Sequence, residues 1–233
     1  MDMTTSFISF EDANQVFLQE CPGGFDDPEF HKYERTLKMN ANHFFHTELP
    51  LERYELLLSD GNFELITKLL CTGYRKVKRS LMSSMETIAF NDGLKDPVVA
   101  ARYATTLLQF LRNPSDRSAF ESYASTIKSF PSPGRRPDTW PVLSSIPHLY
   151  NPNCPMLKPR AMKTFTTAMD IPFDYRSDLN WLTWSSLLDI YNDLFEKLAP
   201  LGARDYIDVW SWIWVVVYWP ESPKKTKPPL VVN

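Results

Sequence analysis

The chain has 233 residues, of which 43% are hydrophobic and 23% are charged, and its net charge at neutral pH is −3. These proportions are typical of a globular protein and exclude a fully disordered, collagen-like or coiled-coil chain. Because there are only 7 glycines against 19 prolines, a glycine-rich nucleotide-binding loop and an all-β protein with many tight turns are both disfavoured. The small net charge gives no general electrostatic reason to bind nucleic acid.

Up to residue 130, apolar residues recur mostly at three- and four-residue steps, the spacing of one face of a helix. The cluster Ser59–Asn62 is a turn signal. Asp96 followed by Pro97 is a typical helix start, because aspartate caps free amides and proline lacks an amide proton. We expect helices over 29–45, 51–58, 63–70, 77–88, 97–111 and 120–127.

Eight prolines fall between residues 131 and 159. We expect this stretch to be a long irregular connector with at most one short helix, near Val142–Ile146. Its apolar residues predict that it packs on the surface of the protein body rather than extending into solvent. Long connectors of this kind are often functional.

Beyond the connector we expect a helix over 159–169 and another over 179–198, with Asp178 as its N-cap. The last element, 204–219, fits a helical and a strand pattern equally well, and acidic residues in its first turn favour a helix. The sequence therefore predicts a mainly α-helical, irregular single domain over 1–219, with a sub-boundary near 131–140 as the alternative, and a disordered tail over 220–233.

The cysteines Cys21, Cys71 and Cys154 form no CxxC pair and are odd in number, which fits a reducing compartment. The first residues lack the basic and apolar regions of a signal peptide. The most apolar run, Val209–Trp219, is shorter than the roughly 20 residues that a bilayer span needs. We expect a soluble cytoplasmic protein with no membrane partner.

Three segments in the C-terminal part carry a distinctive pattern: MLKPRAMKTF, FDYRSDLNWLTWSSLL and LAPLGARDYIDVWSWIWV. They resemble the C-terminal part of a bacterial protein family in which LKP precedes a helix, an NW helix follows, and a GARD-x-IDV-x-S-x-IW segment ends the pattern. The resemblance covers roughly residues 140–216 and extends weakly to FDDPEFHKYERTLKMNANHFF. It implies relatives, but no established activity comes with it.

The first candidate site lies in this C-terminal block. A fold that brings the 158–160 corner against the 204–208 segment would make a polar cluster beside a wall of tryptophans. We weigh three interpretations: helix capping with a structural ion pair, an anion or phosphate site with a tryptophan as stacking face, and a carboxylate-based catalytic site. The residues concerned are Lys158, Arg160, Trp181, Trp184, Arg204, Asp205 and Asp208.

The second candidate is the basic cluster Arg75, Lys76, Lys78 and Arg79, next to Tyr74. Cations beside an aromatic ring are what a nucleic-acid backbone and base require. Two alternatives are a solvated basic face and a docking surface for the N-terminal third, because residues 1–70 carry 5 basic and 13 acidic side chains whereas residues 71–136 carry 11 basic and 5 acidic ones.

Other signals are weaker. His31, His43 and His46 lie near Glu48, but no supporting ligand follows a recognised zinc spacing, so we expect no metal site. A Cys154–His148 dyad is conceivable from the sequence alone. The chain has no GxxxxGK[ST], GxGxxG, GxSxG or HExxH motif, and we expect no cofactor.

The sequence favours a non-enzymatic binding or interaction module that contacts nucleic acid through the basic residues. The alternatives are a structural or regulatory partner of another protein, and an enzyme with a site near Asp205 and Lys158.

Overall fold

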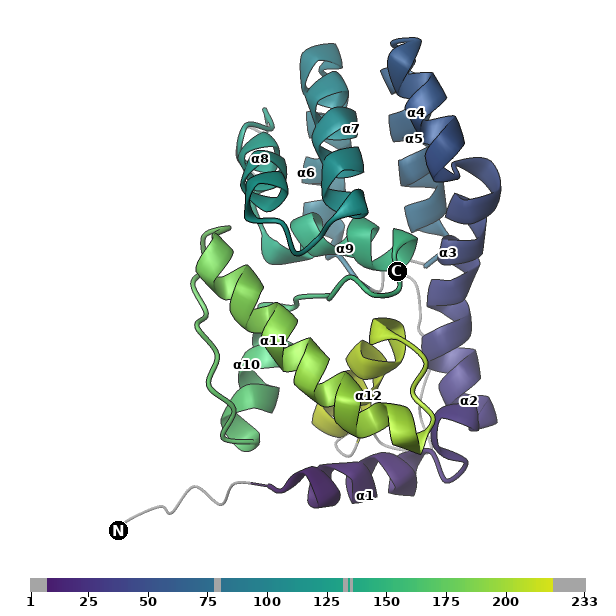
Figure 1. Cartoon of the computed structure of the whole chain (residues 1–233), viewed down its shortest axis with the longest axis vertical. Coiled ribbons are helices and arrows are strands. Elements are labelled where there is room, and N and C mark those ends of the chain that lie inside the picture. Colours follow the sequence, from purple (N-terminus) through teal and green to yellow (C-terminus); the bar gives the residue numbers. More distant parts are fainter. Residues whose placement is uncertain (1–7, 78–80, 132–133, 135, 220–233) are drawn as a thin grey trace.

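The computed structural model describes residues 8–77, 81–131, 134 and 136–219 (Figure 1). Within these ranges every regular element is helical, which confirms the predicted fold class. The elements are α1 (Phe10–Glu20), the 3₁₀ turn η1 (Gly24–Asp26), α2 (Pro28–Phe30), the π-helical turn η2 (His31–Arg35), α3 (Thr36–Glu48), α4 (Leu51–Ser59), α5 (Phe63–Arg75), α6 (Ser84–Gly93), α7 (Pro97–Arg112), α8 (Arg117–Lys128), α9 (Trp140–Tyr150), α10 (Pro159–Ala168), α11 (Trp181–Leu198), the 3₁₀ turn η3 (Ala199–Leu201) and α12 (Tyr206–Tyr218).

Helices α4 to α8 stand side by side in the upper half of Figure 1, and α9 runs across beneath them. Helices α11 and α12 fill the lower half, and α1 lies along the bottom against α12. Helix α9 touches α3, α5, α6, α7, α8 and α12, so it joins the two halves. One cluster of buried apolar residues extends from α1 to α12. The residues 132, 133 and 135, inside the predicted sub-boundary, and the predicted tail 220–233 lie outside the described residues.

The 131–159 stretch differs from the prediction. Helix α9 is longer than Val142–Ile146, and all eleven of its residues are buried in the centre of the protein rather than on its surface. Pro141 sits in the first turn, where no amide proton is needed. Pro147 leaves the carbonyl of Leu143 without its helical donor, and the hydroxyl of Tyr123 donates to that carbonyl at 3.3 Å. A tertiary contact therefore makes the interior proline tolerable.

The expected helix over 77–88 is also wrong. Helix α5 continues to Arg75, and α6 begins only after Ser83, which forms a capping box with Glu86. Val77 and Leu81 are buried, whereas Met85 and Ile88 are 58% and 40% exposed, so the four residues that suggested one long helix do not form one core-facing stripe. The remaining predicted helices of the first 130 residues are present with shifted ends, and Asp96 caps α7 as expected, accepting from the amide of Val98 at 2.8 Å.

Helix α11 is capped by Asn180 rather than by Asp178. The side chain of Asn180 accepts from the amide of Thr183 at 2.9 Å, whereas Asp178 contributes only its backbone carbonyl, which accepts from the Asn180 amide group at 2.7 Å. The helix runs into η3 and ends at Gly202, whose φ of 103° is in the left-handed region that glycine tolerates.

The 206–218 segment is a helix, which settles the choice between helix and strand. Trp210, Trp214 and Tyr218 lie one turn apart, with ring centroids 5.9 and 4.3 Å from one another. Most of α12 is buried, because α1, α10 and α11 all pack against it. In the ranges that the structure describes, no helix has both the length and the apolar character to cross a membrane.

Candidate functional site

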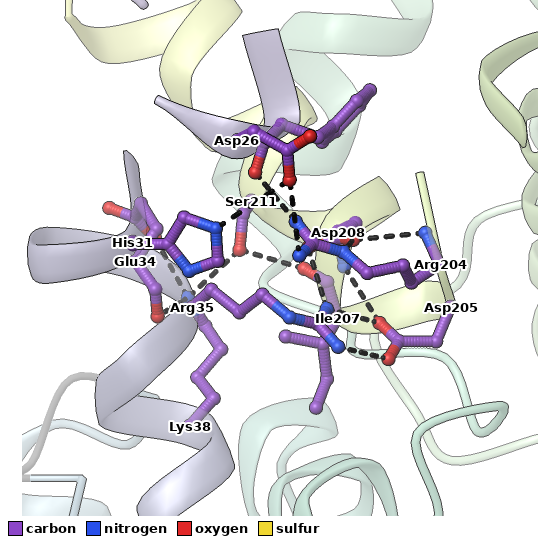
Figure 2. A network of polar contacts seen from close by, with 11 residues as sticks. Asp26, His31, Glu34, Arg35, Lys38, Arg204, Asp205, Ile207, Asp208 and Ser211 are labelled. Atoms are coloured by element: carbon purple, nitrogen blue, oxygen red, sulfur yellow. Dashed lines mark hydrogen bonds and ion pairs between the residues drawn. The ribbon is translucent and has the colours of Figure 1, made fainter. Parts of the chain in front are cut away.

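A dense network of charged side chains surrounds Arg35, the last residue of the π-helical turn (Figure 2). Its guanidinium donates to both carboxylate oxygens of Asp205, at 3.0 and 2.8 Å, and lies 2.7 Å from Asp208 Oδ1. The side chains of Arg35 and Asp205 are each 11% exposed, and that of Asp208 is fully buried. The forked contact with Asp205 is the geometry that arginine and carboxylate favour.

A second arginine closes the network from the other side. Arg204 Nε and the Arg204 amide donate to Asp208 Oδ2 at 2.9 and 3.0 Å, and the guanidinium also donates to the carbonyl of Phe25 at 2.6 Å. Asp205 in turn accepts from the amide of Asp208 at 3.1 Å and so caps α12. Two arginines and two aspartates balance in charge, and each aspartate accepts from more than one donor.

Lys38, on α3, extends the polar region. Its ammonium donates to Glu34 Oε2 at 2.7 Å, to the Glu34 carbonyl at 3.2 Å and to Ser211 Oγ at 3.1 Å. An ammonium has three protons, so all of them are used. Ser211 donates to the carbonyl of Ile207 at 2.7 Å and is fully buried, so this serine–lysine pair has no free nucleophile to offer a substrate.

The role of this network is to hold two parts of the fold together. Burial alone would lower the pKa of Arg35, but its hydrogen bonds to Asp205 and the charge of Asp208 outweigh that effect and raise the pKa. The guanidinium therefore stays charged and clamps α12 to the turn before α3. The network lies between elements about 170 residues apart in sequence.

The structure gathers only part of the first candidate site. Arg204, Asp205 and Asp208 meet, as the sequence suggested, but their main partner Arg35 was missed. Lys158 instead lies over the ring of Trp214, 4.9 Å from its centroid, and burial lowers the pKa of its ammonium. Arg160 is exposed and takes no part in the network. The lysine–proline corner does dock on α12, but through a tryptophan rather than through the aspartates.

His148 and Cys154 also come together, although not as a catalytic dyad. His148 Nδ1 donates to the backbone carbonyl of Cys154 at 2.7 Å, and both residues are fully buried. Burial raises the pKa of the Cys154 thiol, which disfavours the reactive thiolate. Burial also lowers the pKa of His148 to about 4, despite the hydrogen bond to Cys154 that opposes this shift.

The burial of His148 predicts how the stability of the fold depends on pH. Its ordinary pKa is 6.5, so between neutral pH and about pH 4 the unfolded chain takes up a proton that the folded chain refuses. The contribution of His148 to the free energy of unfolding is therefore present above pH 6.5 and decreases as the pH falls. Near pH 4 the loss is about 3 kcal/mol. His148→Asn should remove that part of the loss. Urea unfolding of the original protein and of His148→Asn, each at neutral pH and near pH 4, measures this difference. If the stability of the two proteins depends on pH in the same way, His148 is not the group responsible.

The two candidate tryptophans have different environments. Trp184 is fully buried between Phe110 and Phe120, and its indole donates to the carbonyl of Pro114 at 2.9 Å, so it cannot be a stacking face for a ligand. Trp181 is partly exposed and meets Phe120 edge to face, with 5.7 Å between the centroids. Of the two predicted stacking residues, only Trp181 is accessible.

Trp181 lines a groove of about 590 Å³ between α8 and the start of α11, which we call the α8–α11 groove. One of its cations is neutralised, because Arg117 pairs with Glu121 at 2.7 Å. Lys128 and Arg176 are exposed, and neither forms an ion pair within the described part of the chain. The charged lining residues are Arg117, Glu121, Lys128, Arg176 and Asp178, and the aromatic ones are Phe120 and Trp181.

The second predicted candidate is only partly described. Arg75 and Lys76 are exposed at the end of α5, and Lys78 and Arg79 lie outside the described residues. Tyr74, the proposed base-stacking ring, is buried, and its hydroxyl accepts from the amide of Met82 at 2.7 Å. The cluster therefore lacks its aromatic partner. Lys76 itself lies over Phe44, 5.4 Å from the ring centroid, at the edge of a groove of about 420 Å³.

The three histidines near Glu48 in the sequence have different surroundings. His46 Nε2 lies 3.0 Å from the carbonyl of Tyr150, His31 lies 3.9 Å from Asp26, and His43 lines the groove beside Lys76. Over the described ranges, no three histidine, cysteine or acidic side chains form a group that could hold a metal ion.

Comparison with known proteins adds nothing to this description: no family model, curated protein or solved structure matches the chain. The resemblance to a bacterial family therefore stays a prediction.

Proposed function

We propose that this protein is a non-enzymatic binding module that contacts single-stranded nucleic acid through the α8–α11 groove. The observation that carries the proposal is a partly exposed tryptophan, Trp181, in the same groove as Lys128 and Arg176, two cations that form no ion pair with any residue that the structure describes. Stacking of bases on an aromatic ring and attraction of the backbone by nearby cations are the two components of such binding.

The surroundings of the two aspartates that suggested an enzyme favour a binding module instead. Asp205 and Asp208 are held by Arg35 and Arg204, so they are engaged in the fold rather than presented to a substrate. Arg75, Lys76 and Arg160 remain exposed cations, and we assign them a weaker, sequence-independent attraction for the phosphate backbone. A protein partner is less favoured, because in the described part of the chain the large exposed apolar side chains come from five elements, and only Met85 and Ile88 share a helix there. The odd number of cysteines and the lack of a CxxC pair support a reducing, cytoplasmic location.

Fluorescence anisotropy of a labelled oligothymidylate at low salt tests the proposal. We expect salt-dependent binding in which Lys128 and Arg176 together contribute about −1.4 to the slope of log affinity against log salt. The Lys128→Ala/Arg176→Ala variant should lose that contribution. Trp181→Ala should weaken binding by about 1–3 kcal/mol, the usual effect of one stacked base.

A matched control removes two cations elsewhere. Lys68 and Arg102 are exposed on α5 and α7 and do not line the α8–α11 groove, so Lys68→Ala/Arg102→Ala changes the net charge equally. We expect that variant to bind nearly as well as the original protein. The proposal is wrong if no binding occurs at low salt, or if the two double variants lose affinity to the same extent.

A further inference from the structure

We infer that the nucleic-acid site continues from the α8–α11 groove along the segment 171–182 to a second stacking position at Tyr175. This inference rests on the proposed function and extends it from one base to a multi-nucleotide track. The segment that joins α10 to α11 runs along one edge of the molecule, from the lower end of α10 to the start of α11 beside α8 (Figure 1).

A second groove lies along this segment. It has a volume of about 450 Å³, and we call it the α10 groove. Its lining combines one cation, one carboxylate, two aromatic rings and two threonines. The residues used here are Lys163, Thr166, Thr167, Asp170, Phe173 and Tyr175.

The two grooves are neighbours. Tyr175 lines the α10 groove and the next residue, Arg176, lines the α8–α11 groove. Burial and then the negative charge of Asp178, which lines the α8–α11 groove, raise the pKa of the Tyr175 phenol. In the proposed track, a strand passes from Arg176 in one groove to Tyr175 in the other.

The segment that carries Tyr175 is held firmly on α11. Thr183 Oγ1 donates to the carbonyl of Asp174 at 2.7 Å and accepts from the amide of Arg176 at 2.8 Å, so the residues on both sides of Tyr175 are fixed by one hydroxyl. The indole of Trp140 also donates to the carbonyl of Arg176 at 2.9 Å. A ring on such a fixed backbone loses little conformational entropy when a base stacks on it.

Charge and spacing suit a strand rather than a single nucleotide. Lys163 Nζ lies over one face of the Tyr175 ring, 5.4 Å from its centroid, and Lys128 and Arg176 line the groove that contains Trp181, so each ring shares its groove with a cation. Tyr175 and Trp181 are six residues apart, at most about 20 Å of extended chain. Single-strand sites of at least about 4 nucleotides are usual for proteins that combine stacking with backbone attraction.

Asp178 opposes the ligand, because it is the acidic side chain of the α8–α11 groove that no cation neutralises in the described part of the chain. A phosphate passing from one groove to the other would be repelled by it. Removing this charge should therefore strengthen binding, which is the reverse of the effect expected for the cations.

The experiment compares oligothymidylates of about 3 and about 12 nucleotides in the anisotropy assay. Tyr175→Ala should weaken binding of the long strand by about 5- to 150-fold and leave the short strand unchanged, since the short strand can occupy the α8–α11 groove alone. Tyr175→Phe keeps the ring and should bind normally. Asp178→Asn should bind the long strand more tightly.

The outcomes separate the two proposals. If the short strand binds and depends on Trp181, but Tyr175→Ala binds the long strand as the original protein does, the extended track is wrong and the proposed function stands. If neither strand binds, both are wrong. Because Tyr175 is partly exposed, the variants should stay folded, and unchanged circular dichroism would show that they do.

Discussion

Replacing Arg35 with methionine is expected to lower the free energy of unfolding by about 3–5 kcal/mol. The substitution leaves Asp205 and the fully buried Asp208 without their shared guanidinium. Arg204 still holds Asp208, so the main uncompensated charge is that of Asp205. A total stability of about 5–15 kcal/mol is usual for a domain, and this one side chain would then account for a large part of it.

Urea unfolding followed by circular dichroism measures the change, and two further variants interpret it. Arg112→Met removes an exposed pair with Glu55 and should cost less than about 1 kcal/mol. Adding Asp205→Asn to Arg35→Met should restore part of the loss, because the unpaired charge disappears. A loss for Arg35→Met no larger than that for Arg112→Met would contradict the structural role given to the network.

Replacing Trp184 with alanine is expected to cost about 3–5 kcal/mol. The indole fills the space between α8 and α11, against Phe110 and Phe120, and satisfies the carbonyl of Pro114. Its removal leaves a cavity and an unpaired carbonyl. The matched variant is Trp181→Ala, three residues earlier on the same helix, which should cost about 1 kcal/mol or less because its ring is partly exposed.

Thermal and urea unfolding of the two alanine variants, with Trp184→Phe as an intermediate case, test this difference. Trp184→Phe keeps most of the packing but loses the hydrogen bond to Pro114, so we expect a loss between those of the other two. Equal destabilisation by Trp181→Ala and Trp184→Ala would mean that the two rings have the same role. Trp181 would then not be a free stacking face.

The sequence predicts helices well wherever local signals decide. Asp96 and Pro97 mark the start of α7, because capping depends on nearby residues only. It fails at α9, where a distant hydroxyl, that of Tyr123, compensates for Pro147. It also fails at α6, where the Ser83–Glu86 capping box starts a helix later than the apolar stripe suggests.

The candidate site is less predictable for the same reason. Arg35 was missed because nothing in its own segment shows that Asp205 and Asp208 will face it from 170 residues away. The role of Trp184 could have been found, because it falls on the same helical stripe as Leu187, Tyr191 and Leu194. The accessibility of Trp181, and the absence of an ion pair at Lys128 and Arg176 within the described ranges, depend on how α8 meets α11, which no local pattern predicts.

The most direct test of nucleic-acid binding at these grooves is ultraviolet crosslinking of a halogenated oligothymidylate, followed by trypsin digestion and mass spectrometry. Cleavage after Lys163, Arg176 and Lys197 separates the peptide 164–176, which contains Tyr175, from the peptide 177–197, which contains Trp181. We predict crosslinks in both peptides. Crosslinks confined to the peptide 69–75, which ends at Arg75 of the basic cluster, or the absence of any crosslink at low salt, would contradict the account.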